Sequence, residues 1–176
     1  FRSSVSDKPC CIIDFGAAHT KLVIIKDGEI YADNIIYVGI RDIQKHIINY
    51  FGIREEELES WQANFSIESY RQNQEHRELF QIIMPLIDEL TSSINRFLQF
   101  FSTQNRGELV NKLILTGGGA LWKGLGSFIA REAGISLATE PELATSVVDL
   151  TAVNLEKEKL HLLSNAIGLA MRGVVY

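Results

Sequence analysis

Three consecutive glycines, Gly117 to Gly119, lie between a segment with strand character, Val110 to Leu115, and a segment with helical character, Leu121 to Ala133. Glycine loses more conformational freedom on folding than any other residue, so three in a row carry a large entropic cost. One explanation is a tight strand-to-helix turn that needs positive φ, for which a single glycine usually suffices. We favour the other explanation, in which an anion or the edge of a nucleotide approaches backbone N–H groups at the start of the helix.

The chain opens with three segments of strand character. Pro9 to Asp14 is a short apolar run that ends in an acid, and Lys21 to Lys26 is rich in β-branched residues. Asp27-Gly28 is a strong hairpin signal, and Glu29 to Val38 follows it as a third strand. We therefore expect three consecutive strands, the last two joined as a hairpin.

The turn between the first two strands is a second candidate binding element. Its small residues, among them Gly16 and Ala17, can present backbone N–H groups to a phosphate, as anion-binding nests do. Asp14 can orient a metal-bound water, and the hydroxyl of Thr20 can donate to a phosphate oxygen. The alternative is an ordinary hairpin in which Asp14 satisfies turn amides, and the turn taken alone favours this simpler explanation.

Helical patterns follow the strands. Ile40 to Phe51 has helical spacing and stops at Gly52, and a short acidic helix is expected over Arg54 to Glu59. The longest periodic segment runs from about Leu79 to Phe101. Pro85 inside it predicts a kink, or a helix that begins just before it.

After the glycines and their helix, which Gly134 stops, Ile135 to Leu137 is a short strand and Lys159 to Arg172 a last helix. The order is strand, strand, strand, helix, strand, helix, strand, helix. This order predicts an α/β fold with a mixed sheet and helices on both faces. It is the order of the ribonuclease-H-like core, the unit that is duplicated in actin-like ATPases.

Composition excludes several classes of protein. A net charge of −5 gives no electrostatic reason to expect nucleic acid, and no apolar stretch reaches the roughly 20 residues that cross a bilayer. Adjacent Cys10 and Cys11 indicate small buried hydrophobic residues in a reducing, cytoplasmic compartment, because neighbouring cysteines rarely pair. The four histidines show no zinc-ligand spacing. The first residue is Phe1 rather than Met, which suggests a fragment or a processed form.

Single residues carry weaker signals. Glu59 can contact a ribose hydroxyl, although a solvated acidic helix face explains it more simply. Trp61 is expected in the core, and His19 is given no role because a lone histidine is more often structural. The sequence contains no nucleophile–base signature, no Walker A motif and no Gly-x-Ser-x-Gly elbow.

The two turns, in this order and at this separation, resemble those of the actin-like ATPase superfamily. The closer similarity is to the PilM family of type IV pilus assembly and its relative, the FtsA family of bacterial cell division. It covers nearly the whole chain from Cys10 onward. The stretches that carry it are Ile12-Ile13-Asp14-Phe15-Gly16-Ala17, Gly39 with the helix after it, Leu79 to Leu90, Arg96 to Phe101, Leu113 to Leu125 (the strongest), Asp149 to Leu155, and Ala166 to Ala170.

The resemblance implies roles for named residues and a division of the chain. ATP and Mg²⁺ are the implied ligands, with Asp14 facing the metal. Glu59 falls on the family's ribose-contacting helix, where a lysine often follows three residues later and this sequence has Gln62. Residues 1–39 and 79–176 would form subdomain IIA, and 40–78 a small inserted subdomain IIB. The family's second phosphate loop falls on Asp14, Gly16, Ala17 and Thr20. Its adenosine motif falls on Gly117, Gly118 and Gly119.

The resemblance also implies a function. Such a protein is a cytoplasmic scaffold that binds ATP as a structural or regulatory ligand. Its partner is the short cytoplasmic tail of an inner-membrane pilus-assembly protein similar to PilN, and self-association is a further expectation. The family's tail-binding groove lies largely in the other half of the fold, which also supplies the first phosphate loop. Nothing before Cys10 can supply that loop, so we expect the chain alone to form half a cleft and to be inactive as an ATPase.

Two alternatives stay open at this point. One is a phosphotransferase of the sugar- or acetate-kinase type, which shares the superfamily core but needs a catalytic acid and a sugar pocket. The other is an FtsA-like cell-division protein, which normally carries a C-terminal amphipathic membrane helix. The sequence ends at Met171-Arg172-Gly173-Val174-Val175-Tyr176 without such a helix.

Overall fold

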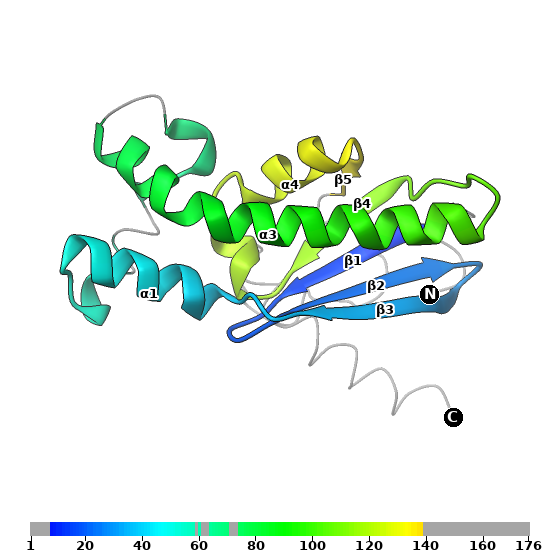
Figure 1. Ribbon diagram of the computed structural model, residues 1–176, viewed down its shortest axis with the longest axis horizontal. Coiled ribbons are helices and arrows are strands. Elements are labelled where there is room, and N and C mark those ends of the chain that lie inside the picture. Colours follow the sequence, from blue (N-terminus) through cyan, green and yellow to red (C-terminus); the bar gives the residue numbers. More distant parts are fainter. Residues whose placement is uncertain (1–7, 59, 61–63, 71–73, 139–176) are drawn as a thin grey trace, which may run out of the picture.

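The computed structural model describes residues 8–58, 60, 64–70 and 74–138. Five strands in this part of the chain form one mixed sheet in the order β3-β2-β1-β4-β5 (Figure 1). β1 pairs antiparallel with β2 and parallel with β4, so the predicted mixed α/β sheet is confirmed. The strands are β1 (Cys10–Phe15), β2 (Thr20–Lys26), β3 (Glu29–Ile36), β4 (Lys112–Thr116) and β5 (Ser136–Leu137).

The hairpin between β2 and β3 forms at the predicted turn. Asp27 has a φ of 53° and Gly28 a φ of 79°, and two successive positive φ angles are what a tight two-residue hairpin turn requires. β3 is an edge strand of the sheet, and most of its residues are exposed. The first three strands therefore follow from short local signals in the sequence.

One face of the sheet carries the main core. Helix α3 (Gln74–Gln104) runs along this face, as Figure 1 shows. From β1, Cys11, Ile13 and Phe15 are fully buried in the same cluster, as the two-residue alternation of a strand requires. The buried residues of α3 recur at mostly three- and four-residue steps and form the matching stripe: Leu79, Ile83, Ile87, Leu90, Thr91, Ile94, Phe97 and Phe101.

The opposite face of the sheet carries a smaller apolar cluster. Cys10 and Ile114 lie there and are buried with Ala138. The helix expected over Lys159 to Arg172, which would supply the second helical layer, lies outside the described residues. The expected division into residues 1–39 with 79–176, and 40–78, stays a prediction.

Helix α3 is longer than its sequence pattern indicates. It begins at Gln74 rather than near Leu79, and it continues through Pro85. Pro85 is exposed, and so is Gln81, whose carbonyl loses its partner four residues later. Water can solvate that carbonyl, which makes a proline tolerable here. The alternative that the helix begins just before Pro85 is therefore wrong.

The segment after the glycines also differs from the expected single helix. Gly118–Leu121 forms one turn of 3₁₀ helix, η3, and Trp122 is extended. Helix α4 (Leu125–Ala133) begins only after Gly124, which has a φ of 81°. The cause is a distant contact: the N–H of Ile67 donates to the carbonyl of Lys123 at 3.0 Å and holds the chain extended there.

The remaining helices lie between β3 and α3 in the chain. Helix α1 (Ile40–Phe51) ends at Gly52, which has a φ of 64° and acts as the left-handed cap that the sequence predicts. Short 3₁₀ turns follow at Glu55–Glu57 (η1) and Ile67–Ser69 (η2). None of the helices in the described ranges is both long and apolar enough to span a membrane.

Candidate functional site: two turns at one edge of the sheet

The two predicted binding turns lie side by side because β1 and β4 are parallel neighbours. Asp14, near the end of β1, is in register with Thr116, the last residue of β4. A β-carbon built on Gly117 would stand 2.6 Å from Asp14 Oδ1 and 2.6 Å from the carbonyl oxygen of Phe15. The turn after β1 and the turn after β4 therefore meet at the same edge of the sheet. This edge is where ligands bind in open α/β sheets.

The three glycines of the second turn differ in what the fold demands of them. Gly117 has a φ of 82° and no room for a side chain. Gly119 is buried, and a β-carbon there would stand 2.0 Å from Phe15 Cδ1. At Gly118 a β-carbon would meet no atom of the described residues within 4 Å, and its φ lies outside the positive range. The fold thus explains Gly117 and Gly119 but not Gly118.

The turn after β1 presents two backbone donors. The N–H of Gly16 lies 3.1 Å from the carbonyl oxygens of both Asp14 and His19, which closes the turn. Ala17 and Ala18 are exposed, and within the described residues nothing accepts a hydrogen bond from their N–H groups. The backbone of this turn can therefore serve an external acceptor.

The N-terminus of α1 packs against this turn, a contact that the sequence analysis missed. The N–H of Ile40 donates to the carbonyl of Gly16 at 3.0 Å, and the N–H of Arg41 donates to the carbonyl of Ala17 at 3.0 Å. Gly39 lies so close that a β-carbon would stand 2.4 Å from Ala17 O. The available signal was a glycine at a helix start, where Ser, Thr, Asp or Asn is more usual.

Thr20 is placed beneath the turn and is fully buried. Its hydroxyl donates to the carbonyl of Val38 at 2.7 Å. This bond explains the residue without any ligand, because a buried hydroxyl needs a partner. A contact between Thr20 and a phosphate oxygen stays a prediction.

Asp14 is the one acid among the predicted contacts that the structure describes. It is half-buried, and its carboxylate is held against Gly117. The described residues contain no group of three or more His, Cys, Asp or Glu side chains that could hold a metal. A single carboxylate still fits Mg²⁺, which keeps several waters and is commonly held by one or two carboxylates together with substrate phosphates.

The predicted ribose contact cannot be placed. Glu59 and Gln62, and Trp61 between them, lie outside the described residues. The segment just after them is tied to the chain beyond the glycine turn. Phe65 makes an edge-on ring contact with Trp122, with centroids 6.0 Å apart, and Trp122 Nε1 is buried without an acceptor in the described part of the chain.

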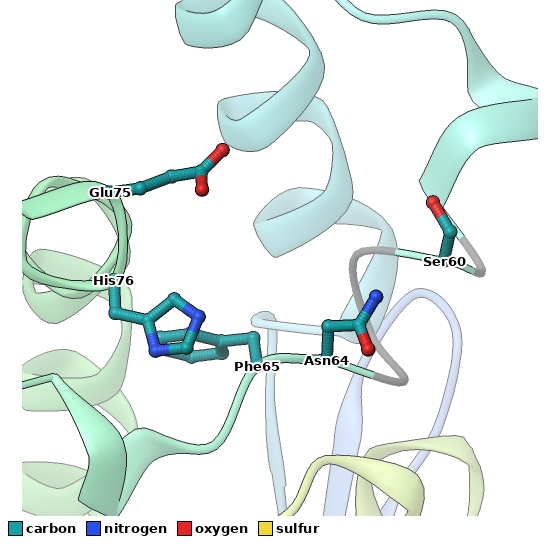
Figure 2. A pocket seen from close by; sticks show the side chains of 5 residues that line it. All are labelled: Ser60, Asn64, Phe65, Glu75 and His76. Carbon is teal, nitrogen blue, oxygen red and sulfur yellow. The ribbon is translucent and has the colours of Figure 1, made fainter. Parts of the chain in front are cut away.

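A hollow of about 170 Å³ opens beside this segment, lined by Ser60, Asn64, Phe65, Glu75 and His76. Figure 2 shows Glu75 and His76 projecting from one side and Ser60 lying opposite them. Small-molecule sites usually measure roughly 300–1,000 Å³. This hollow alone is therefore too small to enclose a nucleotide. None of the predicted contacts in the two turns lines it.

A larger hollow of about 460 Å³ lies between edge strand β3 and helix α3. Ile35, Tyr37 and Phe100 line it and are exposed. None of the predicted site residues contributes to it.

The chain is similar to known proteins in sequence and in structure. The sequence matches the family described as type IV pilus assembly protein PilM over residues 1–174. A solved PilM–PilN type IV pilus biogenesis complex is similar to this chain with a TM-score of 0.70 and 26% identity, over 97% of this chain and 47% of that one. None of the curated proteins matches the sequence.

Two actin-like proteins show the same fold at lower identity. An archaeal actin homologue in complex with ADP has a TM-score of 0.63 and 16% identity, over 97% of this chain and 51% of that one. MreB 5 of Spiroplasma citri bound to AMPPNP has a TM-score of 0.58 and 14% identity, over 96% of this chain and 56% of that one.

This chain spans about half the length of the solved relatives that it matches. The match over residues 1–174 covers nearly all of the sequence, and the mixed sheet is that of the actin-like relatives. The chain therefore belongs to the family of the type IV pilus assembly protein PilM, and its fold is actin-like.

Proposed function

We propose that this chain is part of a cytoplasmic, actin-like scaffold of a type IV pilus or related secretion machine. It binds ATP as a structural or regulatory ligand at the sheet edge formed by Asp14 and Gly117. The family membership supports the pilus role. The ADP and AMPPNP in the solved actin-like relatives support the class of ligand.

The observation that carries the nucleotide proposal is the open space at Gly118. Glycine costs roughly 0.5–1 kcal/mol relative to alanine in a helical position, and Gly118 begins a 3₁₀ turn. Among the described residues, nothing occupies the place where a β-carbon would stand. A glycine is useful there if a ligand approaches the backbone closely. An adenosine lying flat on the Gly117 to Gly119 turn is such a ligand.

Each proposed contact has a chemical role. The N–H groups of Ala17 and Ala18 donate to phosphate oxygens, and their turn begins at Gly16. Asp14 would hold Mg²⁺ through one of its waters, and the ion would supply positive charge to the phosphates. Glu59 contacts the ribose. A phosphate contact of Thr20 would compete with the hydrogen bond that its hydroxyl donates to the Val38 carbonyl.

The proposed partner is the cytoplasmic tail of an inner-membrane protein similar to PilN. The PilM–PilN complex, which is 26% identical to this chain, supports this class of partner. Such a tail would place the scaffold at the inner membrane without inserting it. Because this chain spans about half of its relative, we assign none of its residues to the tail. Self-association is proposed from the family resemblance alone.

Calorimetric titration of ATP with Mg²⁺ tests the nucleotide proposal, using the protein as its gene encodes it. The wild type should bind ATP, and Gly118→Val should weaken binding by about tenfold or more, since it fills the space that the base would occupy. Ser136→Val is the matched control, because Ser136 is exposed on β5 and pairs with the other end of β4. Equal affinity of wild type and Gly118→Val would rule out this site.

A further inference from the structure

The N-terminal turn of α1 contacts the phosphate-binding turn through its backbone. We infer that this helix turn orients and polarises the Ala17 and Ala18 N–H groups, with Gly39 as the positioning residue that permits the contact. The inference deepens the proposed nucleotide function and rests on it. Helix α1 thus contributes to phosphate recognition through the turn, without contacting the phosphate itself.

The direction of the two donors follows from peptide geometry. The Gly16 carbonyl, which accepts from Ile40, shares a peptide plane with the Ala17 N–H. The Ala17 carbonyl, which accepts from Arg41, shares a peptide plane with the Ala18 N–H. The described peptide bonds are all trans, so in each plane the C=O and the N–H point in opposite directions. Both N–H groups therefore point away from α1.

The same connection has an electrostatic consequence. The N-terminus of a helix carries a partial positive charge, here directed at the two carbonyl oxygens. A carbonyl that accepts a hydrogen bond polarises its peptide group, and the N–H of that group becomes a stronger donor. The helix dipole is thus transmitted through two peptide groups to the Ala17 and Ala18 N–H.

The donors at the start of α1 are all accounted for in this arrangement. The N–H of Gly39 donates to Asp42 Oδ2 at 3.0 Å, and the N–H of Asp42 donates to the Gly39 carbonyl at 3.1 Å. Ile40 and Arg41 supply the two bonds to the turn. The first donors of a helix lack partners within the helix, and here the turn satisfies two of them.

Gly39 is required by contact and not by conformation. Its φ is −129°, which any residue adopts. A β-carbon would stand 2.4 Å from Ala17 O and 2.6 Å from the carbonyl carbon of Ala18. Both atoms are backbone, so they cannot rotate away. An alanine here must push the turn away from the start of α1 and turn the two donors out of position.

The test compares ligands that differ only in phosphate content. Titrations of adenosine, ADP and ATP are run with the wild-type protein, Gly39→Ala and the control Gly28→Ala. Gly28 lies at the other end of β2, where its φ of 79° makes an alanine strained, so this variant controls for a strained glycine substitution away from the turn. Gly39→Ala should lower the affinity for ADP and ATP by about tenfold, the effect of losing charge-assisted donors. The affinity of Gly39→Ala for adenosine should stay within about twofold of the wild-type value.

Amide exchange in the wild type tests the inference without a variant, should Gly39→Ala fail to fold. ATP should slow exchange at the Ile40 and Arg41 amides by about fivefold or more relative to adenosine. The amide of Gly52, which donates to Ile48 at the other end of α1, should not respond. Exchange rates at the Ile40 and Arg41 amides that ATP leaves unchanged would overturn this inference but not the proposed function. So would an equal loss of affinity for adenosine, ADP and ATP in Gly39→Ala. Failure of the wild type to bind any of them would overturn it together with the proposed function.

Discussion

The carboxylate of Asp14 lies against the α-carbon of Gly117, where a β-carbon would stand 2.6 Å from Asp14 Oδ1. The two residues are 103 positions apart in the chain, and the parallel pairing of β1 with β4 brings them together. A side chain at position 117 would displace the carboxylate. The acid of one turn and the glycine of the other therefore lie at the same edge of the sheet, where some residues serve folding and others binding.

The glycines at 118 and 119 should separate binding from stability. Gly118→Ala meets open space, so the free energy of unfolding should stay the same or rise by up to about 1 kcal/mol, while ATP affinity falls. Gly119→Ala places a β-carbon 2.0 Å from Phe15 Cδ1, and overpacking of this kind costs roughly 1–3 kcal/mol or more. Urea denaturation and ATP titration of both variants measure the contrast. If both variants lose the same stability, the turn is structural throughout.

Thr20 should prove to be a structural residue. Thr20→Val keeps its shape but removes the donor to the Val38 carbonyl, leaving a buried acceptor unsatisfied. The expected loss is about 1–3 kcal/mol in the free energy of unfolding, measured by urea denaturation. Thr20→Ser retains the hydroxyl and serves as control. A loss of ATP affinity in Thr20→Val without a loss of adenosine affinity would support the predicted phosphate contact, whereas equal affinities would contradict it.

Lys26 should stabilise the end of the sheet farthest from the site in a pH-dependent way. Its Nζ donates to Glu108 Oε2 at 2.6 Å and to Asn105 Oδ1 at 2.8 Å, which joins β2 to the loop after α3. The hydrogen bond to Glu108 raises the pKa of Lys26 above its ordinary value, and burial opposes it. A raised folded-state pKa contributes stability below the unfolded pKa and loses it as pH rises through the folded value.

The corresponding measurement compares wild type with Lys26→Met. At about pH 8 the wild type should have the higher urea midpoint, and the difference should shrink above about pH 10.4, where lysine deprotonates. Glu108→Gln tests the partner and should lose the pH dependence in the same range. A difference between wild type and Lys26→Met that is constant up to about pH 11 would show that packing, not charge, accounts for it.

Both cysteines should be unreactive in the folded protein. Burial raises the pKa of Cys10, and it raises the pKa of Cys11 to about 12, with the neighbouring Cys10 adding to the shift. At about pH 8 almost no thiolate forms, and the thiolate is the reactive species. Iodoacetamide should label neither residue in the native protein and both in denaturant. Rapid labelling of the native protein would contradict the burial of this strand.

The strands were predictable because their signals are local. Asp27-Gly28 fixes the hairpin, and the stop of α1 at Gly52 needs only a glycine after an amphipathic stretch. The pairing of the Asp14 turn with the Gly117 turn was implied by the family resemblance, and in the structure Asp14 lies near the end of β1 while Gly117 follows its parallel neighbour β4. These features depend on residues close in sequence or on a general rule of sheet topology.

Features that depend on distant contacts were missed. The delayed start of α4 results from the bond between Ile67 and Lys123, and the early start of α3 is accompanied by the ring stack of Tyr70 on Phe80, with centroids 4.2 Å apart. The role of Gly39 depends on its approach to Ala17, 22 positions earlier in the chain. No local propensity encodes such approaches, so they become visible only in three dimensions.

Amide mapping of the protein with ATP and Mg²⁺, using ¹⁵N-alanine and ¹⁵N-glycine labels, shows whether nucleotide binds where Asp14 and Gly117 meet. We expect the largest shifts at Ala17, Ala18 and Gly118, with smaller shifts at Gly39, which lies behind the turn. Gly28 and Gly134, which are open to solvent elsewhere on the fold, should not respond. Shifts at those two glycines with none at Ala17, Ala18 and Gly118, or no response to ATP at any of the labelled amides, would contradict a nucleotide site at this edge of the sheet.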